Sequence, residues 1–205
     1  MYRNRQPIVL ASGSPRRRQF LKELGLDFSV RTGTVAEQPM EGEKPEDFVL
    51  RMADEKAAEM SGQYPEAWVI AGDTVVCLDR KILGKPADEE EAVALLMALS
   101  GREHRVMTGF CVAHAGRGIK TVESVTTYVR FIRFSEQLAR AYAATGECLD
   151  KAGAYGIQGI GGCLVESIDG SYSNVVGLPL SQLLQVLLVH GVIEPAPPGV
   201  GKGRR

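Results

Sequence analysis

Residues 12–18, with the sequence Ser-Gly-Ser-Pro-Arg-Arg-Arg, narrow the possible folds of this chain more than any other stretch. The apolar run before them, residues 8–11, is typical of a buried strand, and the apolar residues after them recur at helical spacing. The stretch therefore predicts a turn from a strand into a helix. Ser14 suits the N-cap of that helix, and Pro15 suits its first position.

Three arginines, Arg16, Arg17 and Arg18, fall in the first turn of this helix, at the positive end of its dipole. A basic side chain at that end costs about 0.3–1 kcal/mol, so the run breaks a local rule. An anion held there would reverse the sign of the effect, because backbone N–H groups and guanidinium groups together form a cradle for polyphosphate. The alternative is a solvated basic turn whose arginines pair with surface acids.

Length and charge set the class of protein. A chain of 205 residues is long enough for one well-packed domain, or for one domain with lobes, and we expect a single domain that spans residues 1–193. The net charge of −1 excludes a general polyanion-binding field, which argues against a nucleic acid as partner. Residues 194–205, rich in Pro, Gly and basic side chains, predict a disordered tail.

The apolar stretches and the cysteines indicate a compartment. No stretch reaches the length of a membrane span or of a signal-peptide core, so we expect a cytoplasmic protein with no membrane partner. The four cysteines are scattered without CxxC spacing, which is typical of buried reduced thiols and not of a zinc site or a disulfide framework. The three histidines are isolated from one another, and each is expected to have a structural or surface role.

Residues 68–76 form an apolar run of strand character that Gly72-Asp73 interrupts. A carboxylate inside such a run is costly unless it is paired, hydrogen-bonded or bound to a metal ion. Asp73 is therefore a candidate to hold a divalent cation or to activate water. The alternative is an aspartate in a turn or a bulge.

Residues 150–159 form a glycine-rich stretch that also carries Asp, Lys, Tyr and Gln. Loops of this kind bring backbone close to a ligand and place polar groups around it. The alternative is a flexible surface loop.

The remaining pattern predicts, in chain order, a strand at 28–33, a helix at 46–60, a helix capped by Asp88, a hairpin of 105–114 and 121–131, a strand at 163–165 and a last helix opening at Pro179.

Five motifs, in this order and at this spacing, resemble the Maf family of nucleoside triphosphate pyrophosphatases over about residues 7–191. They lie at residues 11–17, 71–76, 84–86, 99–101 and 150–159. Any one of them is a weak signal, whereas their combination is specific. The version of the last motif is similar to that of the branch that hydrolyses dTTP and UTP, and a sister branch directed at methylated guanine nucleotides differs in this loop.

The resemblance implies an α/β fold with a long mixed β-sheet flanked by helices, in two lobes with a central cleft, as in inosine triphosphate pyrophosphatase-like proteins. It implies hydrolysis of a nucleoside triphosphate to the monophosphate and pyrophosphate, as in a house-cleaning enzyme. It also implies a divalent metal cation, Mg²⁺ or Mn²⁺, as cofactor. A homodimer is left open by analogy with the family.

The resemblance also assigns roles to individual positions. Asp73 falls on the catalytic carboxylate, and Glu37 joins it as the expected metal ligand. Arg16, Thr74 and Gln158 fall on positions associated with substrate choice, and Gln158 offers both a donor and an acceptor to the edge of uracil or thymine. Ser12, Arg17, Lys56 and Lys85 fall on further substrate-binding positions. The cationic members of this set are expected to neutralise the triphosphate.

Two other functions remain open from the sequence. One keeps the reaction and changes the base, to a purine or another modified nucleotide. The other is a non-catalytic, nucleotide-binding regulator of cell division or septum formation. Detection of pyrophosphate across a panel of nucleotides separates these readings.

Overall fold

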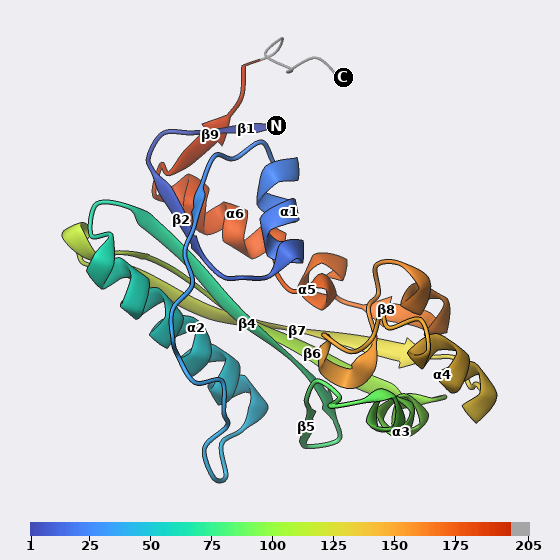
Figure 1. The fold of residues 1–205 in the computed structure, drawn as a ribbon. Coiled ribbons are helices and arrows are strands. Elements are labelled where there is room, and N and C mark those ends of the chain that lie inside the picture. The colour runs from blue at the N-terminus through green and yellow to red at the C-terminus, as the bar shows by residue number, and fades with distance from the viewer. Residues whose placement is uncertain (198–205) are drawn as a thin grey trace.

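The fold is built on one mixed sheet of seven strands. Its long strands β4, β6 and β7 run obliquely across Figure 1. The computed structural model describes residues 1–197. The strands lie in the order β3-β2-β4-β6-β7-β8, with β5 paired to β4. Their bounds are Ile8–Ala11 (β2), Ser29–Val30 (β3), Trp68–Leu78 (β4), Lys81–Leu83 (β5), Glu103–His114 (β6), Ile119–Phe131 (β7) and Val165–Asp169 (β8). Strands β2, β3 and β4 are parallel, and the other pairs are antiparallel.

Helices cover both faces of this sheet, so the predicted α/β class is confirmed. The helices are α1 (Pro15–Glu23), α2 (Pro45–Gln63), α3 (Glu89–Leu99), α4 (Glu136–Ala143), α5 (Tyr172–Val176) and α6 (Leu180–Val189). Short 3-10 turns lie at Ala115–Arg117 (η1), Ala152–Ala154 (η2) and Ile160–Leu164 (η3). None of the helices within residues 1–197 combines the length and the apolar character that crossing a bilayer requires.

Alternate residues of β2 and β4 face opposite sides of the sheet, as the period of a strand demands. One set packs with α1 and α6 and consists of Ile8, Leu10, Trp68 and Ile70. The other set packs against α2 and consists of Val9, Ala11, Val69 and Ala71. Figure 1 shows α2 along one face of the sheet, with α1 and α6 across the other. These layers form a first lobe.

A second lobe surrounds the far ends of β4, β6 and β7. Helices α3 and α4 contribute to its core, which also takes Phe131 from β7 and Tyr155 from the loop after η2. The glycine-rich stretch at 150–159 therefore belongs to this lobe, whereas the arginine turn belongs to the first lobe. Strands β4 and β6 contribute buried residues to both cores and so join the two lobes.

The structure corrects several predicted boundaries. Strand β4 is not interrupted at Gly72-Asp73, because its ladder with β6 stays in register and pairs Asp73 with Gly109. A Cβ on Gly72 would lie 2.9 Å from the Gly109 carbonyl oxygen, so the glycine permits close packing and not a turn. Cys163 is exposed and lies in η3, and strand β8 begins only at Val165.

The predicted tail also begins too early. Strand β9 (Ile193–Pro195) pairs antiparallel with β1 (Tyr2–Asn4), with Arg3 opposite Glu194. Glu194 and Pro195 are thus part of a two-stranded sheet and not of a disordered segment. Residues 198–205 of the predicted tail lie outside the described residues.

His104 joins the sheet to the glycine-rich stretch. It lies in β6, is buried, and its Nε2 is hydrogen-bonded to the hydroxyl of Tyr155 at 2.8 Å. The rings of Phe131 and Tyr155 meet the imidazole edge-on. Burial lowers the pKa of His104 to about 4, so the folded protein keeps this side chain neutral.

We expect the stability of the protein to fall as the pH drops from about 6.5 to about 4. In that window the unfolded chain protonates residue 104 and the folded chain does not, and each unit of pKa difference is worth about 1.4 kcal/mol. Urea unfolding of His104→Gln, which can keep the bond to Tyr155, should show a weaker pH dependence than the parent. His190→Gln is the matched control, and an equal change in both variants would contradict the assignment.

Candidate functional site

A cleft of about 970 Å³ lies between the two lobes, and all nine predicted site residues line it. They are Ser12, Arg16, Arg17, Glu37, Lys56, Asp73, Thr74, Lys85 and Gln158. These residues come from the arginine turn, from the connection before α2, from α2 itself, from β4, from the segment after β5 and from the loop after η2. The fold therefore gathers in one place residues that are far apart in the sequence.

The cleft passes over an unpaired edge of β4. Strand β2 ends at Ala11, opposite Ala71, and β5 reaches β4 only at Val76. The edge of residues 72–75 thus faces the cleft. Because successive side chains of a strand point to opposite faces, Asp73 lies on the side of α2 and Thr74 lies on the side of α1 and α5. Two adjacent residues of one strand thus contribute to the cleft from opposite faces of the sheet.

The arginine turn has the predicted local structure. Helix α1 begins at Pro15, and the side chain of Ser14 caps it by accepting the backbone N–H of Arg17 at 3.4 Å. The Ser12 hydroxyl accepts the backbone N–H of Ser14 at 3.3 Å and so stabilises the approach to the helix. The strand-to-helix turn inferred from residues 8–18 is confirmed.

The three arginines of this turn have different surroundings, in contrast to the prediction of a shared cradle. Arg17 is only 8% exposed, and its guanidinium donates to the carbonyl oxygens of Gly177 and Gly72, at 2.7 and 2.8 Å. It also donates to the hydroxyls of Ser12 and Thr74, each at 3.0 Å. Burial lowers the pKa of Arg17, and the charge of nearby Asp73 opposes that shift. The guanidinium is thus occupied by acceptors of the protein itself.

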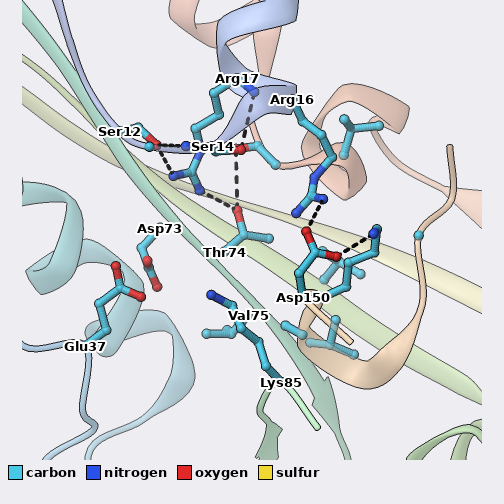
Figure 2. Close-up of a pocket in the computed structure, with 18 of the residues that line it drawn as sticks. Ser12, Ser14, Arg16, Arg17, Glu37, Asp73, Thr74, Val75, Lys85 and Asp150 are labelled. Carbon is cyan, nitrogen blue, oxygen red and sulfur yellow. Dashed lines mark hydrogen bonds and ion pairs between the residues drawn. The ribbon is translucent and has the colours of Figure 1, made fainter. Parts of the chain in front are cut away.

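Arg16 is the arginine of this turn that offers its charge to the cleft. Its closest acid is Asp150 of the glycine-rich stretch, with 3.8 Å between Nη1 and Oδ2, as Figure 2 shows. This distance is long for a hydrogen bond, and both side chains are partly exposed. Arg18 is half-buried and is not among the described residues that line the cleft. Arg16 and Arg17 both line the cleft, but the Arg17 guanidinium already binds four acceptors of the protein, so Arg16 is the better placed to meet a ligand.

Two carboxylates converge on one ammonium group at the opposite side of the cleft. Lys56 of α2 lies 2.8 Å from Oδ1 of Asp73 and 2.5 Å from Oε1 of Glu37. The Asp73 side chain is only 12% exposed, so Lys56 provides the pairing that a buried carboxylate requires. Burial alone raises the pKa of Glu37, but Lys56, Lys85 and Arg17 together bring it below its ordinary value. Both acids are therefore poised to bind a cation.

This pair of carboxylates fits a divalent metal ion. The acids approach each other closely enough to share a single positive group, and oxygen donors are the ligands that Mg²⁺ and Mn²⁺ prefer. Within residues 1–197 no group of three or more His, Cys, Asp or Glu side chains is arranged to hold a metal. Mg²⁺ characteristically binds one or two carboxylates together with substrate phosphates, which matches a donor set of this size.

The glycine-rich stretch supplies the remaining side of the cleft. Gln158 is half-buried there, beside Ile157, and Lys85 is exposed just after β5. Lys85 points toward the middle of the cleft in Figure 2. Glycine 153 has a positive φ of 69° and packs on Val76 of β4, so the stretch is anchored to the sheet and is not a free surface loop.

Sequence reasoning missed several residues of the site. Gly177 belongs to the segment after α5 that borders the cleft and accepts a hydrogen bond from Arg17. Thr108 is fully buried in β6 and shares a hydrogen bond of 2.9 Å with Thr74. Glu147 also borders the cleft, directly before the glycine-rich stretch. No local pattern distinguishes these residues, because each of them is held in the site by at least one bond to a residue more than ten positions away.

Comparisons with known proteins point to one family. A family model described as Maf-like protein matches residues 7–189. A protein of Desulfotalea psychrophila named dTTP/UTP pyrophosphatase is 55% identical over 95% of this chain and 100% of its own length. Proteins with the same name from Myxococcus xanthus and Nitratidesulfovibrio vulgaris are 51% and 50% identical; each alignment covers 92% of this chain, and 94% and 90% of the relative, respectively.

A solved structure shares the fold. The HAM1 protein from Coxiella burnetii superimposes with a TM-score of 0.50 at 16% sequence identity, over 90% of this chain and 99% of the HAM1 chain. At this level of identity the likeness concerns the arrangement of helices and strands. It confirms the fold class predicted from the sequence.

We expect Arg17→Lys to destabilise the protein by about 2 kcal/mol or more, because an ammonium cannot reach the four acceptors and leaves buried carbonyl groups unpaired. Urea unfolding measures the change. The neighbouring substitution Arg18→Lys, which is equally conservative, should stay within about 0.5 kcal/mol of the parent. If Arg17→Lys kept full stability and lost only nucleotide binding, Arg17 would be a phosphate ligand and the structural assignment would be wrong.

Proposed function

The chain belongs to the Maf family, and we propose that it hydrolyses dTTP and UTP to the nucleoside monophosphate and pyrophosphate in the cleft between its lobes. The names of its relatives support the reaction and the substrates. The observation that carries the proposal is the placement of two carboxylates and Lys56 on one side of a single cleft, with Arg16 and Lys85 also lining it.

The charges of the cleft suit a triphosphate. Such a chain carries about four negative charges at neutral pH, and its transition state spreads charge over the non-bridging oxygens. Arg16 can offer two parallel N–H donors to a phosphate, and Lys85 offers a mobile point charge. Residues at the start of α1 also line the cleft, and the first turn of a helix favours a bound anion.

A metal ion completes the charge balance in this proposal. Glu37 and Asp73 are the residues that would hold Mg²⁺ or Mn²⁺. When bound, such an ion supplies Lewis-acid stabilisation of phosphate oxygens and acidifies bound water. Lys56 pairs with both carboxylates and holds them close together, which prepares them for a cation.

In this proposal Asp73 activates the nucleophile, which is a water molecule. Lys56 engages Oδ1, so we assign Oδ2 to orient a water molecule and accept its proton. The water oxygen attacks the α-phosphorus, the bond from that phosphorus to the bridging oxygen breaks, and pyrophosphate leaves with the electron pair. Arg16 and Lys85 stabilise the charge that develops on the leaving group.

In this proposal Gln158 recognises the nucleobase of the substrate. Its amide offers one donor group and one acceptor, which complement the alternating acceptor and N–H groups on the edge of uracil and thymine. Thr74 is engaged by Arg17 and Thr108, so its influence on substrate choice acts through the position of the β4 edge.

We expect the purified protein, supplied with Mg²⁺ or Mn²⁺, to release pyrophosphate and not orthophosphate from dTTP and UTP. Asp73→Asn should abolish this turnover and leave the fold intact, since the amide preserves the shape of the side chain and removes the base. Pyrophosphate-coupled detection over a panel of canonical and modified triphosphates measures both. Asp79→Asn, in the exposed turn that follows the same strand, is the matched control.

Three results would contradict the proposal in different ways. Preference for purine triphosphates would change the assigned substrate. Nucleotide binding without any turnover would favour a regulator. Near-normal turnover of Asp73→Asn would remove that carboxylate from the reaction.

We expect Arg16→Ala to raise KM for UTP between about tenfold and 100-fold, because a charge-assisted hydrogen bond is worth about 1.5–3 kcal/mol. Inhibition by inorganic tripolyphosphate should weaken by a similar factor, since Arg16 is assigned to the phosphates. Arg18→Ala serves as the control. An Arg16→Ala variant that binds tripolyphosphate as tightly as the parent would exclude this assignment.

A further inference from the structure

The loop that carries Gln158 is held by a carboxylate that the family resemblance leaves without a role. Glu147 lies between α4 and the glycine-rich stretch, and it is half-buried. Its Oε2 accepts the backbone N–H of Ile160, and its Oε1 accepts that of Gly161, each at 3.1 Å. These two peptide groups immediately follow Gln158 and Gly159 in the loop.

Tyr142, in the last turn of α4, holds the other side of the same loop. Its hydroxyl donates to Oε1 of Glu147 at 2.9 Å and accepts the backbone N–H of Gly156 at 3.1 Å. Gln158 thus sits between anchored peptide groups on both sides. We call this arrangement of Tyr142 and Glu147 the loop clamp.

Glycines allow the loop to lie against the clamp. Gly159 has a φ of +86°, and a Cβ at that position would come within 2.8 Å of the Glu147 carboxylate. A Cβ on Gly161 would collide with the Tyr142 hydroxyl. Gly159 and Gly161 therefore allow the backbone of the loop to pack closely against the clamp, in addition to any close approach of the loop to a ligand.

The clamp is itself fixed. The Thr145 hydroxyl accepts the backbone N–H of Glu147 at 3.3 Å, and the Lys151 ammonium donates to the Glu147 carbonyl. Partial burial alone raises the pKa of Glu147, but the N–H groups of Gly161 and Ile160 outweigh it and bring the pKa below its ordinary value. The side chain is therefore an anion at neutral pH, and its bonds to the loop are charge-assisted.

We propose that Glu147 is a positioning residue for base recognition, which acts with Tyr142 to fix the backbone of residues 156–161 so that Gln158 presents its amide to the nucleobase. This inference rests on the proposed function, because it takes a pyrimidine triphosphate as the substrate. It predicts that the clamp governs the choice of base and leaves the binding of the triphosphate chain unaffected. The reason is geometric: the clamp contacts the loop of Gln158 and makes no described contact with Arg16 or Lys56.

Two substitutions test the clamp separately. Glu147→Gln keeps the shape of the side chain but turns one carboxylate oxygen into an NH₂ group, which cannot accept the loop N–H that it faces. Tyr142→Phe removes the hydroxyl that joins Glu147 to Gly156. The matched controls are Glu136→Gln and Tyr172→Phe, which change exposed residues in α4 and α5 that do not contact the loop.

We expect kcat/KM for UTP to fall between about tenfold and 100-fold in both clamp variants, mainly through KM, since a misplacement of about 1 Å can cost about 100-fold. The ratio of kcat/KM for UTP to that for GTP should fall with it. Inhibition by inorganic tripolyphosphate, which has no base, should stay within about twofold of the parent. The two control variants should match the parent in every measurement.

Hydrogen–deuterium exchange of the peptide that covers residues 156–161 gives a second readout, which requires no activity. We expect faster exchange in that peptide in both clamp variants, with unchanged exchange in β4 and α2. This measurement also identifies a variant that has lost its fold, since exchange would then rise throughout. In that case the other clamp variant decides the question.

The outcomes separate this inference from the proposed function. An equal loss of activity on UTP and GTP, weaker inhibition by tripolyphosphate, or unchanged exchange in the loop would overturn the positioning role. A parent protein that releases no pyrophosphate from UTP or dTTP would overturn the proposed function first, and the base-choice role of Glu147 would fall with it.

Discussion

The buried guanidinium of Arg17 joins the parts from which the cleft is made. It links the turn before α1, the free edge of β4 and the segment at Gly177, which are distant in the sequence. One of its acceptors, the Gly72 carbonyl, belongs to the edge that loses β2 as a partner beyond Ala71. Water could satisfy such a carbonyl, but water would not hold three segments together. The open edge can face a ligand because a charge of the protein holds one end of it, at the Gly72 carbonyl.

A second cation works on the other face of the same strand. Lys56 neutralises Asp73 and reaches Glu37, so the acidic side of the cleft is held by α2 as the basic side is held by α1. The alternation of β4 separates the two environments, with Asp73 toward α2 and Thr74 toward Arg17. This separation lets one strand contribute to chemistry and to structure at adjacent positions. Moving the strand register by a single residue would exchange the two side chains and dismantle both.

Much of the fold and of the site could be predicted from the sequence, for reasons that differ between elements. The turn at residues 12–18 is local: Ser14 and Pro15 specify a helix start wherever the helix lies. The hairpin of β6 and β7 follows from a turn between two β-rich segments. The continuity of β4 through Gly72 could not be predicted, because it depends on Gly109 and on the approach of α2. The burial of Arg17 and the bonds of Glu147 likewise depend on partners that only the tertiary fold supplies.

The arginine turn shows how a broken local rule can have two causes at once. Three basic residues at the positive end of a helix suggest that an anion binds there, and this argument gives all three arginines the same role. In the structure Arg17 is compensated by carbonyl and hydroxyl oxygens of the protein, whereas Arg16 is compensated only by a distant and exposed carboxylate. The unfavourable interaction with the helix dipole is therefore offset by the protein itself at Arg17, whereas at Arg16 a bound ligand would have to offset it. A run of like charges is better treated one residue at a time, since neighbouring side chains of a helix point about 100° apart and meet different surroundings.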